Sequence, residues 1–102
     1  MKNTLEVFKA AEGFDWNGGN IDKNWQRHQV NNKETEEVFL NKPILVNLDQ
    51  RHSLREKRYQ VLGKTNKNRK LFISFTLRNQ KIRIISARNQ SRKERKKYEK
   101  AV

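Results

Sequence analysis

The sequence has no cysteine and a single proline. Without cysteine the chain forms no disulfide and offers no thiolate to a metal, which fits a reducing cytoplasm. With only two histidines besides, a structural zinc site is not expected. No run of about 18 apolar residues is present, so nothing predicts a membrane-spanning helix. Residues 1–14 also lack the long apolar core of a signal peptide.

Acidic residues are scarce in the second half of the chain. Residues 1–50 hold six Lys or Arg and eight Asp or Glu, whereas residues 51–102 hold 18 Lys or Arg and three Glu. The whole chain carries a net charge of +13. This asymmetry predicts an anionic partner, and nucleic acid is the best match. A membrane surface is a poorer match for this anionic partner, because the basic C-terminal segment has few large apolar residues to insert. A merely solubilising surface is the alternative.

The length of 102 residues predicts one domain over residues 1–102 with one modest core. Residues 1–12 are expected to form an arm or a short helix. Asn20 is expected to cap a helix over residues 21–28. Trp25 and His28 fall on one side of that helix, at the spacing of a face packed against a core.

Asn31 or Asn32 is expected to cap a second helix, and Pro43 stops it because proline lacks a backbone N–H and has a fixed φ. Trp16 is assigned to the core. Beyond Pro43 the apolar residues change to the two-residue period of strands. Four strands are predicted, over residues 44–49, 57–64, 70–78 and 81–88. Because most of their links are short, they should form an antiparallel meander.

The segment SRKE at 91–94 indicates the start of a last helix. Ser91 can accept a hydrogen bond from the backbone of Glu94, while the Glu94 side chain reaches back. A basic helix over residues 92–101 follows. The predicted architecture is therefore α+β, with an antiparallel β-meander of about four strands, two N-terminal helices and a basic C-terminal helix.

Three arginines stand on predicted strands or at a strand end: Arg58, Arg83 and Arg88. Three glutamates cannot neutralise the 18 cations of the second half, so several arginines are expected to stay unpaired and to form a phosphate-binding surface. Alternatively, Arg58 and Arg83 pair with Glu56 and Glu94 and only stabilise the fold.

Two residues suit proton transfer to or from RNA. RNA carries its own nucleophile, the 2′-OH, so a ribonuclease needs a base, an acid and cations, but no metal. His52, in a predicted loop, has an intrinsic pKa that suits either role. Tyr98, in the last helix, can donate a hydrogen bond to the scissile phosphate. Alternatively, His52 is an exposed bystander and Tyr98 anchors its helix.

Several segments follow one another in a fixed order between about Phe14 and Tyr98. They are FDWN, GNIDKNWQRHQV, ETEEVF, DQRHSLREKRYQVLGKT, RKLFISFTLR, and IRIISAR followed by KERKKY. In order and spacing they resemble the BrnT family, the toxin halves of type II toxin–antitoxin systems. The chain departs from the family pattern at Asn17, Gln29 and Asn32, where members often carry Asp, Gly and an apolar residue.

The resemblance implies a RelE-like ribonuclease fold and metal-independent RNA cleavage that halts translation, with no cofactor. It also implies neutralisation by a BrnA-like antitoxin, whose DNA-binding domain would take the complex to its own operator. By this analogy, the groups expected around the scissile phosphate and its developing charge are Arg58, Arg83 and Arg88. Tyr98 would orient or protonate, and the candidate proton handlers are His52 and Glu56. Further cations expected to hold the RNA are Lys64, Arg69, Lys70, Arg92, Lys93 and Lys96.

A rival of another class is a non-catalytic basic module that binds nucleic acid through the same face. Both would bind RNA in a salt-dependent manner, since each phosphate contact releases counterions. Formation of cleavage products separates them. A third possibility is that the basic face mainly docks an acidic antitoxin tail, with RNA competing for the same surface.

Overall fold

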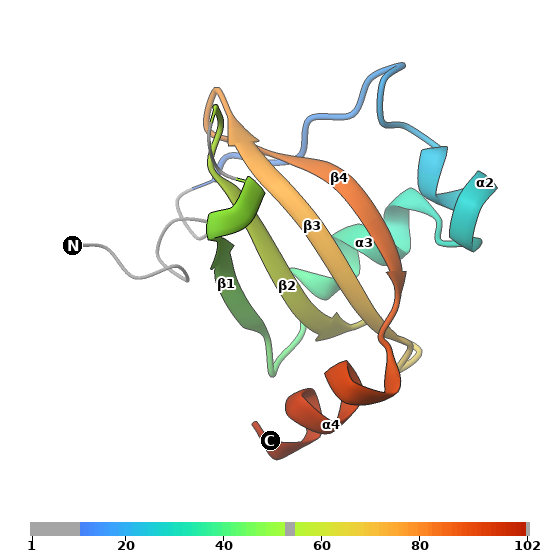
Figure 1. Cartoon of the computed structure of the whole chain (residues 1–102). Coiled ribbons are helices and arrows are strands. Elements are labelled where there is room, and N and C mark those ends of the chain that lie inside the picture. Colours follow the sequence, from blue (N-terminus) through green and yellow to red (C-terminus); the bar gives the residue numbers. More distant parts are fainter. Residues whose placement is uncertain (1–10, 53–54, 102) are drawn as a thin grey trace.

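The computed structural model describes residues 11–52 and 55–101. Residues 1–10, where an arm or a short helix is expected, lie outside the described residues. Helices α2 (Lys23–His28) and α3 (Asn32–Val38) precede a four-stranded sheet, and helix α4 (Arg92–Lys100) follows it (Figure 1). The predicted α+β class, with a basic C-terminal helix, is confirmed.

The sheet is an antiparallel meander with the strand order β1-β2-β3-β4. Its strands are β1 (Leu45–Asp49), β2 (Arg58–Lys64), β3 (Lys70–Arg78) and β4 (Lys81–Asn89). A short 3₁₀ turn, Gln50–His52, follows β1. Asn79 and Gln80 join β3 to β4, and both have the positive φ that a tight two-residue hairpin requires. The four strands match the predicted ranges to within one residue at each end.

Alternation along the strands gives the sheet two faces. The inner face packs against α3, which lies behind the sheet in Figure 1, and buries Val61, Ile73 and Phe75 completely. Gly63 allows this approach, because a Cβ there would lie 2.5 Å from Cγ1 of Val38. The opposite side, which we call the outer face, carries most of the polar and basic residues of the strands. Helix α4 lies against one end of it.

Two buried asparagines attach the α2 region to the edge strand β4. Nδ2 of Asn20 donates to the backbone oxygen of Ile84 at 3.2 Å, and Oδ1 of Asn24 accepts from the backbone N–H of Ala87 at 2.9 Å. The register of β3 and β4 shifts between these positions, which leaves Ile85 as an extra residue in β4. The asparagines therefore satisfy backbone groups that a bulged edge strand would otherwise leave unpaired.

The prediction that Asn20 caps the first helix is therefore wrong. Asp22 stands at that position, with a left-handed φ of 60° and no capping hydrogen bond from its side chain. The inward face of this helix was also assigned wrongly: His28 is exposed, and Trp25 is 52% exposed. Helix α2 turns Asn24 inward instead, because the bulged strand needs a polar partner more than an apolar one.

Two other predictions for the N-terminal half are confirmed, although α3 ends at Val38 and not at Pro43. Trp16 packs against the core, and its indole N–H donates to Glu36 at 2.8 Å. Asn31 caps α3 by accepting from the backbone N–H of Glu34 at 2.8 Å, and the Glu34 side chain accepts from the backbone of Asn31. Gln29 has a left-handed φ of 52° at the end of α2, a conformation that glycine adopts more readily than glutamine.

Helix α4 begins with the predicted capping box. The backbone N–H of Glu94 donates to Oγ of Ser91 at 3.2 Å, and the backbone N–H of Ser91 donates to Oε1 of Glu94 at 2.8 Å. No helix in residues 11–52 and 55–101 is long and apolar enough to cross a membrane.

Candidate functional site

An imidazole and a carboxylate meet where β1 ends and the 3₁₀ turn begins. Nδ1 of His52 lies 2.9 Å from Oδ2 of Asp49, and the backbone N–H of His52 donates to Oδ1 at 3.3 Å. An ionised carboxylate only accepts, so Nδ1 carries the proton and Nε2 of the neutral ring keeps its lone pair. The side chain of His52 is 60% exposed, which leaves the ring accessible to a ligand.

Asp49 is held in its ionised form by this neighbourhood. Burial raises the pKa of Asp49, but the hydrogen bond from His52, the charge of His52 and a hydrogen bond from Gln60 together bring it below its usual 3.8. An ionised Asp49 fixes the orientation and the tautomer of the imidazole, as a carboxylate does for a general-base histidine.

His52 also lines a pocket of about 410 Å³ whose other walls are Arg51, Arg55, Glu56 and Arg58. Three residues expected to act in the chemistry, His52, Glu56 and Arg58, therefore come together here. Three arginines around one histidine suit a phosphodiester, because guanidinium groups bind phosphate oxygens in pairs. In the part of the chain that the structure describes, no three His, Asp or Glu side chains gather as a metal site.

Glu56 fits a structural role better than the predicted role in proton transfer. Its Oε2 accepts from Nε of Arg78 at 3.1 Å, and its Oε1 accepts from Nη2 of the same guanidinium at 3.2 Å. The hydrogen bonds from Arg78 lower the pKa of Glu56, and the charges of Arg58 and Arg83 lower it further. A carboxylate held in this state is a weak base and is not protonated at neutral pH.

Arg58, Thr76 and Arg83 lie side by side on the outer face, one on each of β2, β3 and β4. The side chain of Arg83 is only 14% exposed. Its Nη1 lies 3.5 Å from Oδ2 of Asp15, and its Nη2 donates to Oδ1 of Asn17 at 3.2 Å. Arg83 therefore adds charge beside the pocket, but its guanidinium is largely used within the fold.

Acids of the first half neutralise arginines of the second half, which the sequence did not reveal. Nη1 of Arg69 donates to Oε1 and Oε2 of Glu34 at 3.2 and 3.1 Å. The same guanidinium donates to the backbone oxygens of His28 and Gln29. Arg69, like Arg83, thus ties the two halves together. The structure does not favour its expected contact with RNA.

The other end of the outer face lies under α4. Nη1 and Nη2 of Arg88 donate to the two oxygens of Glu94 at 2.8 and 3.0 Å, and the guanidinium stacks 4.2 Å above the ring of Phe72. Tyr98 is 2% exposed, its hydroxyl donates to the backbone oxygen of Pro43, and burial raises its pKa. This placement favours the anchoring role for Tyr98 and separates both residues from the histidine pocket.

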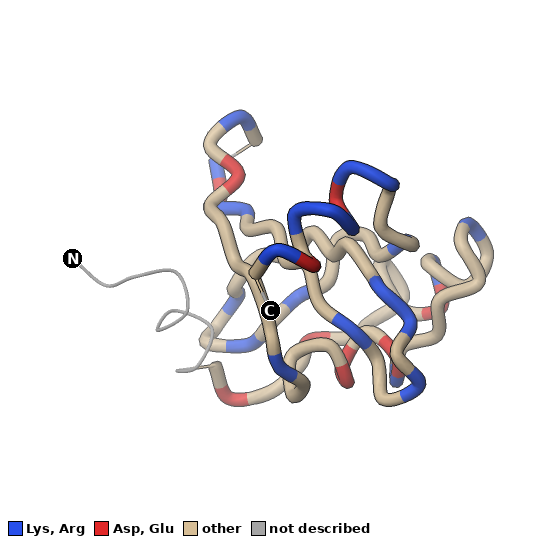
Figure 2. Tube along the Cα trace, turned by 90° about the horizontal axis from the view of Figure 1, so that it is seen from below, with Lys and Arg blue, Asp and Glu red and all other residues tan. Residues whose placement is uncertain are grey.

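Exposed cations surround this end of the molecule. Arg92, Lys93 and Lys96 are exposed on α4. Lys64 and Lys70 are Cα partners at the ends of β2 and β3. Viewed from the side of α4, lysine and arginine positions occur on the helix and along several strands (Figure 2). Their roles in RNA binding stay predictions.

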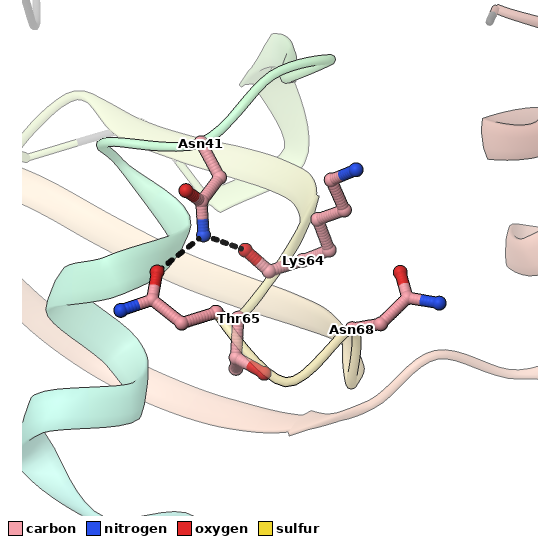
Figure 3. Close-up of a pocket in the computed structure, with 5 residues that line it drawn as sticks. Asn41, Lys64, Thr65 and Asn68 are labelled. Atoms are coloured by element: carbon pink, nitrogen blue, oxygen red, sulfur yellow. Dashed lines mark hydrogen bonds between the residues drawn. The ribbon is translucent and has the colours of Figure 1, made fainter.

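The most voluminous of the described pockets, about 550 Å³, lies beside the turn between β2 and β3 (Figure 3). Its lining residues are Asn41, Lys64, Thr65, Asn66 and Asn68. Nδ2 of Asn41 donates to the backbone oxygen of Lys64 and to Oδ1 of Asn66, both at 3.0 Å, so this amide holds the turn. With one ammonium and no group for proton transfer, the pocket is a poor reactive site despite its volume.

The family model of the ribonuclease toxin BrnT of type II toxin–antitoxin systems matches residues 16–94. The chain belongs to the BrnT family. No curated protein matches the chain. The α+β fold with its C-terminal helix agrees with the RelE-like fold of BrnT proteins. A ribonuclease toxin of type II implies RNA as the substrate and an antitoxin as the partner.

Three residues of the candidate site were missed by sequence reasoning: Asp49, Arg51 and Arg55. Asp49 precedes His52 by three residues at the end of a predicted strand, and this spacing was the available signal. The two arginines carried no signal beyond their charge. They line the pocket only because the chain turns sharply after β1.

Proposed function

We propose that this chain is a metal-independent endoribonuclease whose reactive pocket is the one lined by His52 and Arg58. The observation that carries the proposal is the oriented imidazole of His52, held by Asp49 beside three arginines. A base with a free Nε2 and a set of fixed cations are the two things that RNA transesterification requires of a protein.

In the proposed reaction Nε2 of His52 takes the proton of the RNA 2′-OH. The 2′-oxygen forms a bond to phosphorus, the bond between phosphorus and the 5′-oxygen breaks, and the departing 5′-oxygen takes a proton from water. Arg55 and Arg58 stabilise the extra negative charge on the phosphoryl oxygens of the transition state. The products are a 2′,3′-cyclic phosphate and a 5′-hydroxyl, and the imidazolium releases its proton to solvent.

The test is incubation of the purified chain with a mixed RNA pool in EDTA, with and without translating ribosomes, followed by analysis of the product ends. We expect 2′,3′-cyclic phosphates, and a loss of about 10²- to 10⁴-fold in rate for His52→Ala. His28→Ala is the matched control, because His28 is exposed on α2. Full-rate cleavage by His52→Ala would remove that residue from the mechanism. Intact RNA in both arms, with salt-sensitive binding retained, would favour the non-catalytic module.

We further propose that a BrnA-like antitoxin neutralises the chain in the cytoplasm and carries the complex to operator DNA. The type II family and the net charge of +13 support this, because a cationic face attracts an acidic partner segment. Adding the antitoxin should abolish RNA cleavage, and only the complex should retard operator DNA on a gel. Equal operator binding by the chain alone would contradict the assignment of DNA binding to the antitoxin.

A further inference from the structure

A second pocket on the outer face, of about 310 Å³, lies under α4 and is separate from the histidine pocket. Its floor includes Leu62 and Phe72, which are Cα partners on β2 and β3. Beside them stand the amides of Asn47 and Gln60, which are Cα partners on β1 and β2. An apolar floor with a few polar groups at one side is the usual make-up of a site for a small planar ligand.

Helix α4 supplies the rest of the lining with charged groups. Lys93 and Lys97 stand four residues apart, and therefore on one side of the helix, with Glu94 beside them. Both oxygens of Glu94 accept from Arg88, and Oε1 also accepts from the backbone N–H of Ser91. A carboxylate oxygen has two lone pairs, so Oε2 has capacity for one more hydrogen bond.

We propose that this pocket binds an unpaired nucleobase that carries an exocyclic amino group. The inference rests on the proposed ribonuclease function and adds base selectivity to it. Leu62 and Phe72 cover the flat face of the base, and the amide of Asn47 bonds its edge. Glu94 accepts from the amino group, as glutamate does from cytosine N4 in nucleic-acid complexes. A bare phosphate is a poorer occupant, because it would face that carboxylate.

The pocket lies at the right place to hold a nucleotide beside the scissile one. Arg58 and Gln60 are two residues apart on β2 and share the outer face, which separates them by about 7 Å. The side chain of Gln60 lines the base pocket and also donates a hydrogen bond to Asp49, the partner of His52. Lys93 and Lys97 lie where they can neutralise the phosphates that flank the bound base.

The experiment measures binding without cleavage, using 2′-O-methyl hexamers whose nucleophile is blocked. Three hexamers of equal charge are compared: cytidine, uridine and an abasic sugar phosphate. We expect the cytidine hexamer to bind about ten-fold more tightly than the uridine or the abasic hexamer, the effect of one good base contact. Nδ2 of Asn47 donates to N3 of cytosine, an acceptor that uracil lacks because its N3 carries a proton. Asn47→Leu should therefore remove most of this difference and leave the affinity for the abasic hexamer unchanged.

Asn47 is exposed, so its replacement is compatible with folding, and an unchanged melting temperature checks this. Gln26→Leu, which removes an exposed amide from α2, is the matched control and should keep the preference for cytidine. Equal affinities for cytidine and uridine, or a preference that survives Asn47→Leu, would overturn the assignment. Because the hexamers cannot be cleaved, these results stand apart from the RNA pool experiment, whose failure would instead overturn the ribonuclease proposal.

Discussion

The two ends of the outer face are both rich in cations, but they use them differently. At the end next to the 3₁₀ turn, which we call the 3₁₀ end, an exposed histidine, His52, is oriented by the carboxylate of Asp49. The arginines that surround it are Arg51, Arg55 and Arg58. At the α4 end, Arg88 is paired with an acid and stacked on a ring, and the tyrosine is buried. One end presents an accessible imidazole, and the other presents exposed lysines on α4.

This comparison shows that cation content alone does not locate chemistry. Charge density made the C-terminal segment the most conspicuous part of the sequence. The structure places the exposed histidine that Asp49 orients at the opposite end of the sheet, where the chain turns between β1 and β2. For the lysines and arginines on α4 we expect a different contribution, a positive field and counterion release that would give affinity for any RNA.

The largest expected difference between the two ends is in the rate of cleavage. Arg58→Ala should lower the single-turnover rate by about 10²- to 10³-fold, the effect of losing one group that stabilises transition-state charge. Arg88→Ala is the matched change at the other end and should lower the rate less than about ten-fold, since Arg88 contacts Glu94 and Phe72. If Arg88→Ala lost more of the cleavage rate than Arg58→Ala, the reactive pocket would have to be placed at the α4 end instead.

Next in size is the effect of α4 on RNA affinity. The double variant Lys93→Gln with Lys97→Gln should bind RNA with a weaker salt dependence. The slope of log K against log salt concentration should fall by about 0.7 for each phosphate that the variant no longer neutralises, and the cleavage rate of bound RNA should not change. Equilibrium titrations at several salt concentrations measure this slope. Lys23→Gln with Lys33→Gln, two exposed lysines of the first half, is the control. A similar decrease in slope for both pairs of lysines would mean that α4 is not a specific site of contact with the RNA strand.

A smaller effect is expected on the attachment of α4 to the sheet. Tyr98→Phe removes the hydrogen bond to the backbone oxygen of Pro43 and keeps the buried ring. We expect the free energy of unfolding to fall by about 1 kcal/mol, measured by urea denaturation, with the single-turnover rate unchanged. If the rate fell by orders of magnitude at unchanged stability, Tyr98 would be a catalytic residue, as the family resemblance implies.

The smallest expected effect concerns the pH dependence of stability at the α4 end. The hydrogen bonds from Arg88 lower the pKa of Glu94 below its usual 4.5, although burial partly opposes this. A carboxylate whose pKa is lowered by folding stabilises the folded state above pH 4.5, and this contribution is lost as the pH falls through the lowered value.

Glu94→Gln should therefore be less stable than the parent chain near neutral pH, with a difference that shrinks as the pH falls below 4.5. Urea denaturation across this range measures the difference, and glutamine can keep the capping box because it accepts from the same N–H. Glu99→Gln, an exposed neighbour on α4, is the control. A stability difference independent of pH would mean that the shape of the Glu94 side chain, and not its charge, stabilises the folded state.

The sheet and the capping boxes could be predicted because their signals are local. Alternating apolar residues in 70–78 give β3 its bounds, and Ser91 with Glu94 begins α4 where expected. The first helix was harder, because Asn20 and Trp25 have the propensities of a cap and of a core residue. Their positions were decided by a bulged strand more than 60 residues away in the sequence, as the contact between Asn20 and Ile84 shows.

The candidate site was predictable in part. His52, Arg58 and Glu56 were named as separate candidates, and only the fold brings them to one pocket. Charge counting within the second half predicts unpaired arginines, but Arg69 and Arg83 are both paired in the structure. Their acidic partners, Glu34 and Asp15, belong to the first half of the chain, and counting charges within one half cannot reveal such pairs.

The sequence by itself determined the fold class, the basic second half and the resemblance to the BrnT family, because each is a property of residue type and order. Tertiary structure decided which cations remain for a ligand. Ion pairs and hydrogen bonds depend on distances of a few ångströms between residues far apart in the chain. Folding thus uses Arg69, Arg83 and Arg88 in contacts of its own, and it leaves the lysines of α4 exposed at one end of the outer face and the accessible ring of His52 at the other.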